Sequence, residues 1–219
     1  MMNEHILVDY IARKQPTVIT KKKNTYLAYD GDDISYVDIL KSGIVKISVI
    51  LKDGREFNIA YKNKLEIVTL MKDEESAITQ APYNVRIESD TAEFYRIDRL
   101  EFWEDAMYHQ DLLLYTKEFY RQSLQSITQH MQHMVMNGKK GALCALLLEL
   151  SQQFGVQTTE GIQLSIHITN EDIAAFCGIS SDTSVSRMLR ELREHGALAT
   201  ENNNFLITDK EYLEEFLAI

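Results

Sequence analysis

The sequence predicts an α+β protein with an N-terminal β-roll, one long helix and a C-terminal winged helix-turn-helix. Three observations lead to this fold class. Residues 17–98 are β-rich and separated by turns, residues 99–136 contain neither glycine nor proline, and two short helical segments meet at a glycine turn after residue 138. We therefore place the roll at 1–98, the helix at 99–137 and the C-terminal domain at 138–219.

The composition is that of a globular protein that works in a reducing compartment. The 219 residues carry a net charge of -10, with 45% hydrophobic and 26% charged side chains. No apolar run approaches the ~20 residues that a membrane helix needs, and the first residues lack the pattern of a secretory signal. Cys144 and Cys177 form no CxxC pair. We expect a cytoplasmic protein with free thiols and no membrane partner.

The predicted roll consists of six to eight short strands bounded by Gly, Asn or Asp. In one of these strands Val45, Ile47 and Val49 alternate with other residues and share a face. The sequence Lys-Asp-Gly at 52–54 then marks a hairpin turn. Six to eight short strands favour a sandwich or a roll, because a closed sheet leaves few edge strands unpaired.

The long helix carries a heptad pattern, which indicates a seam between two helices. The apolar residues of this pattern are Leu113, Tyr120, Leu124, Ile127, Met131 and Met134. A helix of this length outruns a roll of this size, so we predict that it packs along a second helix. The alternative is a helix that packs only on its own domain. Asn137 and Gly138 end the helix, because both residues tolerate the left-handed conformation, and we place a hinge there.

Two helical segments in residues 169–195 form a predicted helix-turn-helix. Thr169 or Asn170 can cap the first segment, and Gly178 permits the turn. The second segment begins near Ser181 and directs Val185, Leu189 and Leu192 inward. The arginines at 187, 190 and 193 fall on the opposite side of this helix.

The start of the second helix suits the major groove of double-stranded DNA. Small polar side chains allow close approach to the groove, and Arg187 can reach a guanine with its two-pronged guanidinium. The candidate DNA-binding residues are Ser181, Asp182, Thr183, Ser184, Ser186, Arg187 and Arg190. The alternative is a solvated amphipathic helix whose arginines pair with Glu191 and Glu194. Residues 139–219 contain six basic and twelve acidic side chains. We therefore expect an affinity for DNA that is unusually salt-sensitive or depends on another factor.

Two stretches carry a resemblance to a known family. YDGDDISYVDILKSGIVKI resembles the roll signature of the CRP/FNR superfamily, and ITNEDIAAFCGISSDTSVSRMLRELREHGAL resembles its helix-turn-helix. The resemblance implies a cyclic-nucleotide-binding-like roll and a homodimeric transcription regulator that reads a palindrome and is not an enzyme. It also places Arg187 at the family's guanine-reading position. The wing would approach phosphate through Asn202 to Asn204, or these residues simply form a hairpin turn.

One extra residue in the turn indicates a particular branch of this family. Eight residues separate Gly178 from Arg187, one more than in typical members of the family. With NGKKG at the hinge, this spacing most resembles the PrfA-type branch, which activates transcription in Gram-positive bacteria. The resemblance therefore implies an activator, with RNA polymerase as a partner.

The sequence argues against two of the family's cofactors and leaves one effector open. The stretch that would hold a cyclic phosphate, NKLEIVTLMKDEESAITQAPYN, has no glycine or arginine and adds Asp73, Glu74 and Glu75, which argues against cyclic AMP. No N-terminal cysteine cluster exists to hold an iron-sulfur centre. Tyr61 and Lys62 match a pair that lines the glutathione cleft of PrfA-type proteins. Glutathione or a peptide-like molecule is thus a candidate effector, unless these two residues merely finish a strand.

Two further function classes compete with DNA binding. A cupin-like metal enzyme would need histidines on the roll, yet residues 17–98 contain none. His130 and His133 have metal-ligand spacing, but no nearby carboxylate or cysteine completes a site, so we expect no metal. No GxSxG or HExxH motif is present either, and we expect no enzymatic activity. The remaining class is a ligand-sensing roll that acts through a protein partner, which the acidic C-terminal domain would suit.

Overall fold

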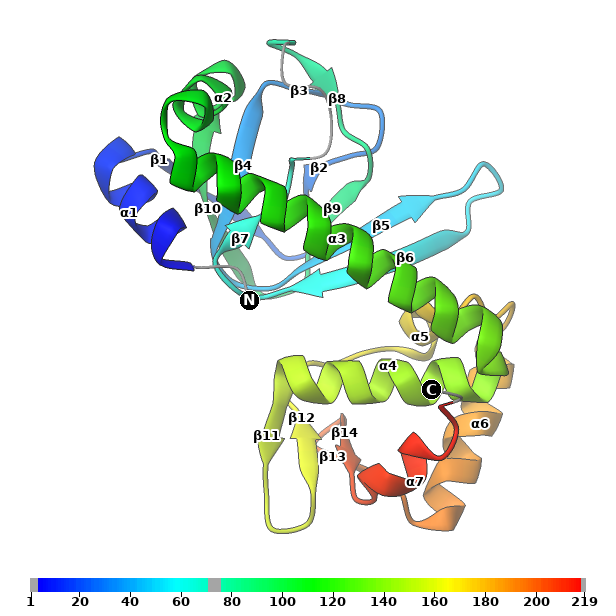
Figure 1. Cartoon of the computed structure of the whole chain (residues 1–219). Coiled ribbons are helices and arrows are strands. Elements are labelled where there is room, and N and C mark those ends of the chain that lie inside the picture. Colours follow the sequence, from blue (N-terminus) through cyan, green and yellow to red (C-terminus); the bar gives the residue numbers. More distant parts are fainter. Residues whose placement is uncertain (1–3, 71–75, 218–219) are drawn as a thin grey trace. The chain divides into compact units, whose positions relative to one another are not determined.

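The computed structural model describes residues 4–70 and 76–217, which form two compact units, Met1–Gln125 and Ser126–Ile219 (Figure 1). The boundary falls inside one long helix, whose two halves therefore belong to different units. Asp73, Glu74 and Glu75, which argued against a cyclic phosphate, lie outside the described residues. No described helix combines the length and apolar character needed to cross a membrane.

The first unit is a β-roll with helices on one side. Its strands are β1 (Thr17–Lys22), β2 (Tyr26–Ala28), β3 (Asp33–Ile34), β4 (Tyr36–Ser42), β5 (Val45–Ile50), β6 (Glu56–Lys62), β7 (Glu66–Ile67), β8 (Thr79–Gln80), β9 (Asn84–Ile87) and β10 (Thr91–Asp98). They form two four-stranded antiparallel sheets, β1-β10-β4-β7 and β2-β9-β5-β6, and the β3-β8 pair. The roll expected between residues 17 and 98 is confirmed.

The core of the roll lies between these two sheets. Val45 and Ile47 of β5 are buried in it against Leu40 of β4 and Phe94 of β10, and Val49 packs at its margin. The alternation predicted for β5 is therefore confirmed. The chain reverses between β5 and β6 at Gly54, whose amide donates to the carbonyl of Leu51.

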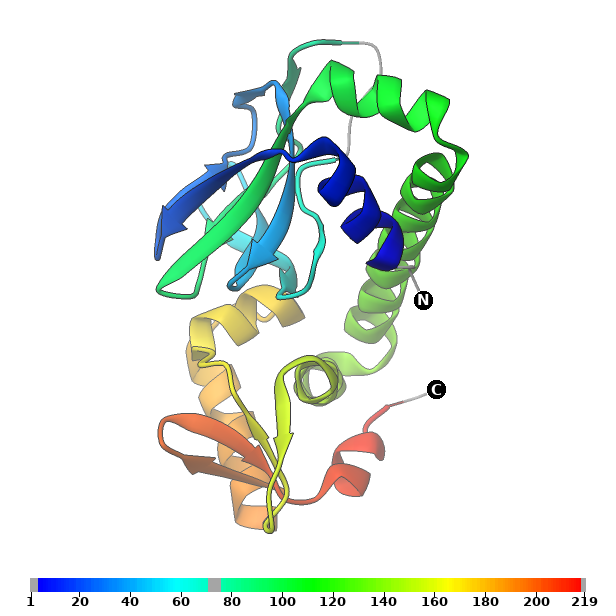
Figure 2. The same ribbon diagram turned by 90° about the vertical axis from the view of Figure 1, so that its left-hand side faces the viewer.

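A second core joins the outer face of the β1-β10-β4-β7 sheet to three helices. These helices are α1 (Glu4–Lys14), α2 (Arg99–Tyr108) and the first half of α3 (Gln110–Met136) (Figure 2). The buried side chains are Leu7, Tyr10, Val37, Ile39, Ile67, Leu70, Ile97, Phe102, Trp103, Ala106, Leu112, Tyr115 and Phe119. Burial of this many apolar groups contributes strongly to the stability of the first unit.

The single helix expected over 99–137 is wrong in its first third. The chain forms α2 and α3, separated at His109, which has an extended backbone with φ -117° and ψ 100°. No proline or glycine marks this break in the sequence. Trp103 of α2 and Leu112 of α3 are buried in the same core, yet they would lie on opposite sides of one straight helix, so the chain must change direction between them. The predicted C-terminal end of α3 is confirmed, since the helix stops at Met136 and Gly138 follows with φ +66°.

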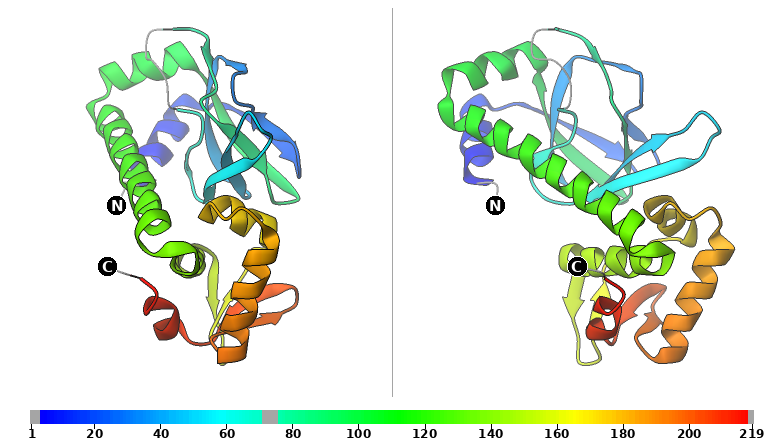
Figure 3. Two further views of the ribbon diagram at one scale, coloured as in Figure 1. Left: turned by 90° about the vertical axis from the view of Figure 1, so that its right-hand side faces the viewer. Right: turned by 45° about the vertical axis from the view of Figure 1, so that its right-hand side comes forward.

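The second unit contains the end of α3 and a winged helix-turn-helix (Figure 3). Its further helices are α4 (Gly138–Phe154), α5 (Asn170–Cys177), α6 (Asp182–His195) and α7 (Lys210–Glu214). Its strands are β11 (Gly155–Gln157), β12 (Ile162–Leu164), β13 (Leu198–Glu201) and β14 (Asn204–Ile207), in the order β11-β12-β14-β13. Helix α4 is buried on nearly all sides and forms the centre of this unit.

Candidate nucleic-acid interface

Helix α5 is fixed at both ends by local hydrogen bonds. Thr169 caps its start with its side chain, which accepts from the amide of Asp172, and the Asp172 carboxylate accepts in return from the Thr169 amide. This reciprocal pair is a capping box. At the other end Gly178 adopts φ +60°, a conformation that side chains disfavour. The chain therefore leaves α5 in a defined direction.

Helix α6 begins where the sequence predicts and buries the expected side. The Ser181 hydroxyl accepts from the amide of Ser184 and caps the helix. Val185, Leu189 and Leu192 are buried as predicted, and Met188 is buried with them. Asp182 is exposed in the first turn, where its charge favours the helix dipole but opposes a DNA phosphate.

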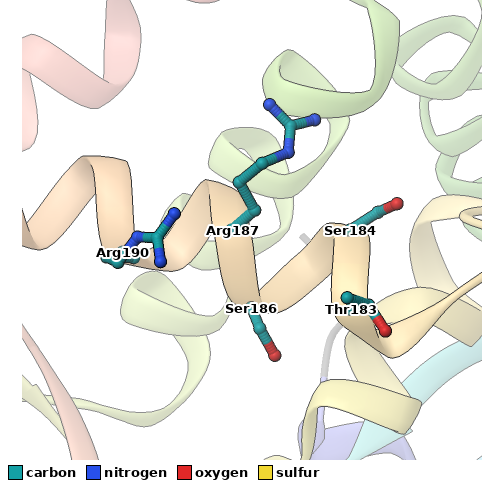
Figure 4. A pocket seen from close by; sticks show the side chains of 5 residues that line it. All are labelled: Thr183, Ser184, Ser186, Arg187 and Arg190. Atoms are coloured by element: carbon teal, nitrogen blue, oxygen red, sulfur yellow. The ribbon is translucent and has the colours of Figure 1, made fainter.

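The outer side of α6 presents the predicted recognition residues around one open hollow. This hollow has a volume of about 450 Å³, and its lining residues are Thr183, Ser184, Ser186, Arg187 and Arg190. Figure 4 shows that Arg187 and Ser186 extend on different sides of the helix axis. The structure thus brings five of the seven candidate residues to one place, with Ser181 and Asp182 directly before them in the chain.

Both arginines of this hollow have carboxylate partners on their own helix. Arg187 Nη1 lies 3.2 Å from Glu191 Oε1, and Arg190 Nε lies 3.7 Å from Glu194 Oε1. These are the pairs that the amphipathic-helix alternative predicts, and they coexist with an exposed recognition face. The side chains of Arg187 and Arg190 remain 63% and 69% exposed, so DNA can still compete for them.

Ser186 and Arg193 have roles that the sequence did not indicate. The Ser186 hydroxyl accepts from Asn170 Nδ2 at 2.9 Å and so joins α6 to the start of α5. Arg193 donates to the Thr200 hydroxyl at 3.3 Å, and its guanidinium lies over the ring of Phe205. Arg193 therefore contacts the wing and differs in this from Arg187 and Arg190.

The wing is the hairpin of β13 and β14. Asn202 and Asn203 at its tip have φ values of +51° and +64°, which asparagine tolerates better than most residues. His167 Nδ1 donates to the carbonyl of Asn203 at 2.8 Å and ties the tip to the chain before α5. Asn204 already belongs to β14.

The candidate effector residues lie at the end of β6 in the first unit. Tyr61 is 5% exposed, and Lys62 Nζ lies 2.8 Å from Glu66 Oε2. The lysine charge is therefore balanced by a carboxylate within the roll. An anionic effector at this point would have to compete with Glu66.

The six residues of the predicted seam differ in exposure along α3. Leu113, Leu124 and Met131 are 39%, 67% and 58% exposed. Tyr120 packs at the margin of the core beneath α3, and the Met134 side chain lies beside Gly178. Ile127 is partly buried. Val135, which the heptad reading left out, is 79% exposed on the same side of the helix as Leu124 and Met131.

His130 and His133 have hydrogen-bond partners within their own unit. His130 Nε2 donates to the carbonyl of Phe176 at 2.8 Å, and His133 Nδ1 accepts from Asn137 Nδ2 at 2.9 Å. Across residues 4–70 and 76–217 no three His, Cys, Asp or Glu side chains come together as metal ligands.

Known proteins resemble both the C-terminal domain and the whole chain. Residues 141–216 match the Crp-like helix-turn-helix domain. The lactate racemization regulatory protein of Lactiplantibacillus plantarum is 45% identical over 97% of this chain and 96% of its own. The listeriolysin regulatory protein of Listeria monocytogenes is 24% identical over 92% of this chain and 84% of its own. The structure of FixK2 from Bradyrhizobium japonicum covers 93% of this chain and 98% of its own, with a TM-score of 0.80 and 16% identity.

Proposed function

This chain belongs to the CRP/FNR superfamily of transcription regulators, and we propose that it works as a homodimer that reads a palindromic DNA site through α6. The observation that carries this proposal is the exposed start of α6. Thr183, Arg187 and Arg190 line one hollow, while Val185, Leu189 and Leu192 anchor the helix from behind. A helix with one buried apolar side and one exposed polar side can enter a major groove while its apolar side chains stay in the protein core.

Specificity in this proposal rests on Arg187. A guanidinium can donate two hydrogen bonds to the O6 and N7 atoms of guanine, which distinguishes guanine from the other bases. Arg190 and Thr183 would contact phosphate or neighbouring base edges. Because acidic residues outnumber basic ones two to one from Lys139 onward, nonspecific attraction to DNA is weak. Binding must therefore depend on a few well-placed contacts.

The proposed dimer forms along the exposed apolar stripe of α3, which we define as Leu113, Leu124, Met131 and Val135. These side chains fall within a narrow sector of the helix and are all at least 39% exposed. Pairing two such stripes would remove them from water, which favours association. A two-fold dimer would present two α6 helices to successive major grooves, ~34 Å apart.

Selection from a pool of random DNA duplexes by the full-length protein tests this proposal. We expect an enriched inverted repeat whose half-sites are centred about one helical turn apart. Failure to enrich any motif would contradict DNA reading and favour a roll that acts through a protein partner. An enriched motif without inverted symmetry would contradict the dimer alone.

The remaining parts of the proposal concern control. We propose that the protein is an activator in the cytoplasm that contacts RNA polymerase. In vitro transcription from a promoter bearing the selected site tests whether it activates or represses. The name of the 45% identical relative makes genes of lactate racemization the first targets to examine, by measuring their transcripts with and without this regulator. Glutathione or a peptide-like molecule is the proposed effector, and repeating the selection with reduced glutathione tests it.

A further inference from the structure

The carboxylate of Glu191 binds two cations from different helices. Its Oε1 atom lies 3.2 Å from Arg187 Nη1, and its Oε2 atom lies 3.3 Å from Lys140 Nζ. Lys140 belongs to the first turn of α4, and its ammonium group lies 4.5 Å from the centre of the Phe216 ring. Glu191 thus has a partner on α4 in addition to Arg187, and Lys140 is itself in contact with the Phe216 ring.

This arrangement gives Arg187 a fixed partner inside the protein. Arg187 and Glu191 are four residues apart on α6, so the guanidinium is drawn along its own helix. In Figure 4 the Arg187 side chain extends away from Ser186 and Thr183. The guanidinium has five N–H donors, but the pair with Glu191 directs it along α6, whereas the two acceptors of a guanine require it to point outward from the helix.

We propose that Glu191 is a positioning residue that competes with DNA for Arg187. This inference rests on the proposed function, because it assumes that Arg187 reads a base. Binding to DNA must break or weaken the Arg187–Glu191 pair, and the free energy of that pair is subtracted from the affinity. Glu191 therefore lowers the affinity of the protein for its DNA site.

Replacement of Glu191 by glutamine tests the proposal, with Glu194→Gln as the matched control. Both changes remove one negative charge from the same helix, and both side chains are exposed enough to tolerate the change, at 37% and 69%. Glu194 pairs with Arg190 and does not contact Arg187. We expect Glu191→Gln to raise affinity for the selected duplex about two- to fivefold more than Glu194→Gln does, at low salt. Glu194→Gln also releases Arg190, which is proposed to contact DNA, so its gain reports the lost charge and that release together. Equal gains would contradict the proposal, because the release of Arg187 would then add nothing of its own.

A double-mutant cycle with Arg187→Ala separates positioning from a purely structural role. If Glu191 acts through Arg187, the extra gain from Glu191→Gln disappears in the Arg187→Ala background. If the extra gain of Glu191→Gln over Glu194→Gln persists in the Arg187→Ala background, the proposal is overturned. If Arg187→Ala alone leaves affinity unchanged, base reading by Arg187 fails, which is a failure of the proposed function and is visible separately from the cycle. Thermal unfolding of each variant shows whether the fold is retained.

Discussion

The Nε2 atom of His130 donates to the backbone carbonyl of Phe176 across 2.8 Å and so joins α3 to the first helix of the helix-turn-helix. The two rings also meet edge to face, with centroids 6.2 Å apart. One turn further along α3, the Met134 methyl group lies beside Gly178, at the end of α5. The C-terminal part of α3 and α5 therefore pack as one body within the second unit. A movement of this part of α3 would carry α5 with it.

His130→Phe tests the value of that hydrogen bond while keeping an aromatic ring. We expect the free energy of unfolding to fall by about 0.5–1.5 kcal/mol, the usual net contribution of one hydrogen bond. Chemical denaturation of the full-length protein measures it. His133→Phe is the comparison, because it also loses one hydrogen bond, the one to Asn137, but that bond does not reach α5. No loss of stability in His130→Phe would show that the bond to Phe176 does not help to hold α5.

Arg187→Ala is expected to weaken binding to the selected duplex by about 1–3 kcal/mol, since the arginine is proposed to read a guanine. Arg187→Lys should restore little of the loss, because an ammonium group does not donate in a two-pronged geometry. Arg190→Ala serves as the comparison. If Arg190 contacts phosphate, its loss weakens all duplexes alike and lowers the salt slope by about one. Titrations at several salt concentrations measure these effects, and equal binding by wild type and Arg187→Ala would remove Arg187 from base reading.

Local sequence signals predicted those parts of the fold that local physics determines. The cap at Thr169, the left-handed Gly178 and the start of α6 at Ser181 each depend on a few neighbouring residues. The alternation of Val45 and Ile47 is equally local, because successive strand residues point to opposite faces. Such features can be recognised without knowledge of the rest of the chain.

Features that depend on tertiary packing could not be predicted in the same way. The break at His109 has no sequence signal, and it exists because α2 and α3 share one core. Helix α1 was missed, although its buried Leu7 and Tyr10 belong to that core. The sequence offered Glu191 as a partner for Arg187, but it did not indicate that Lys140 from α4 would hold the same carboxylate.

Leu124→Glu tests the proposed dimer at the centre of the exposed stripe. Leu124 is 67% exposed in the single chain, so a charge there should leave the fold of one subunit intact. Burying a glutamate in a seam between two helices is costly, because the charge loses its hydration. We expect the variant to sediment as a monomer and to bind the selected palindrome far more weakly than wild type does.

Leu114→Glu is the matched control for the dimer experiment. Leu114 is 52% exposed on the same helix but lies about 100° around the axis from Leu113, outside the stripe. It should remain a dimer. If Leu124→Glu also sediments as a dimer, or if wild type is a monomer when bound to DNA, pairing along this stripe is wrong.

The two cysteines should be protected from alkylation in the folded protein. Burial raises the pKa of both the Cys144 and the Cys177 thiol to about 12 from an ordinary value of 9.0, because a thiolate is poorly solvated in the core. At pH 8 both thiols are therefore protonated and enclosed. We expect iodoacetamide to leave the native protein unlabelled, measured by intact mass, and to modify both thiols once denaturant is added. Because the folded pKa values are raised, the stability that these thiols contribute is fully present below pH 9 and is lost as the pH rises from there toward 12. Rapid labelling of either thiol in the native protein at pH 8 would contradict their burial.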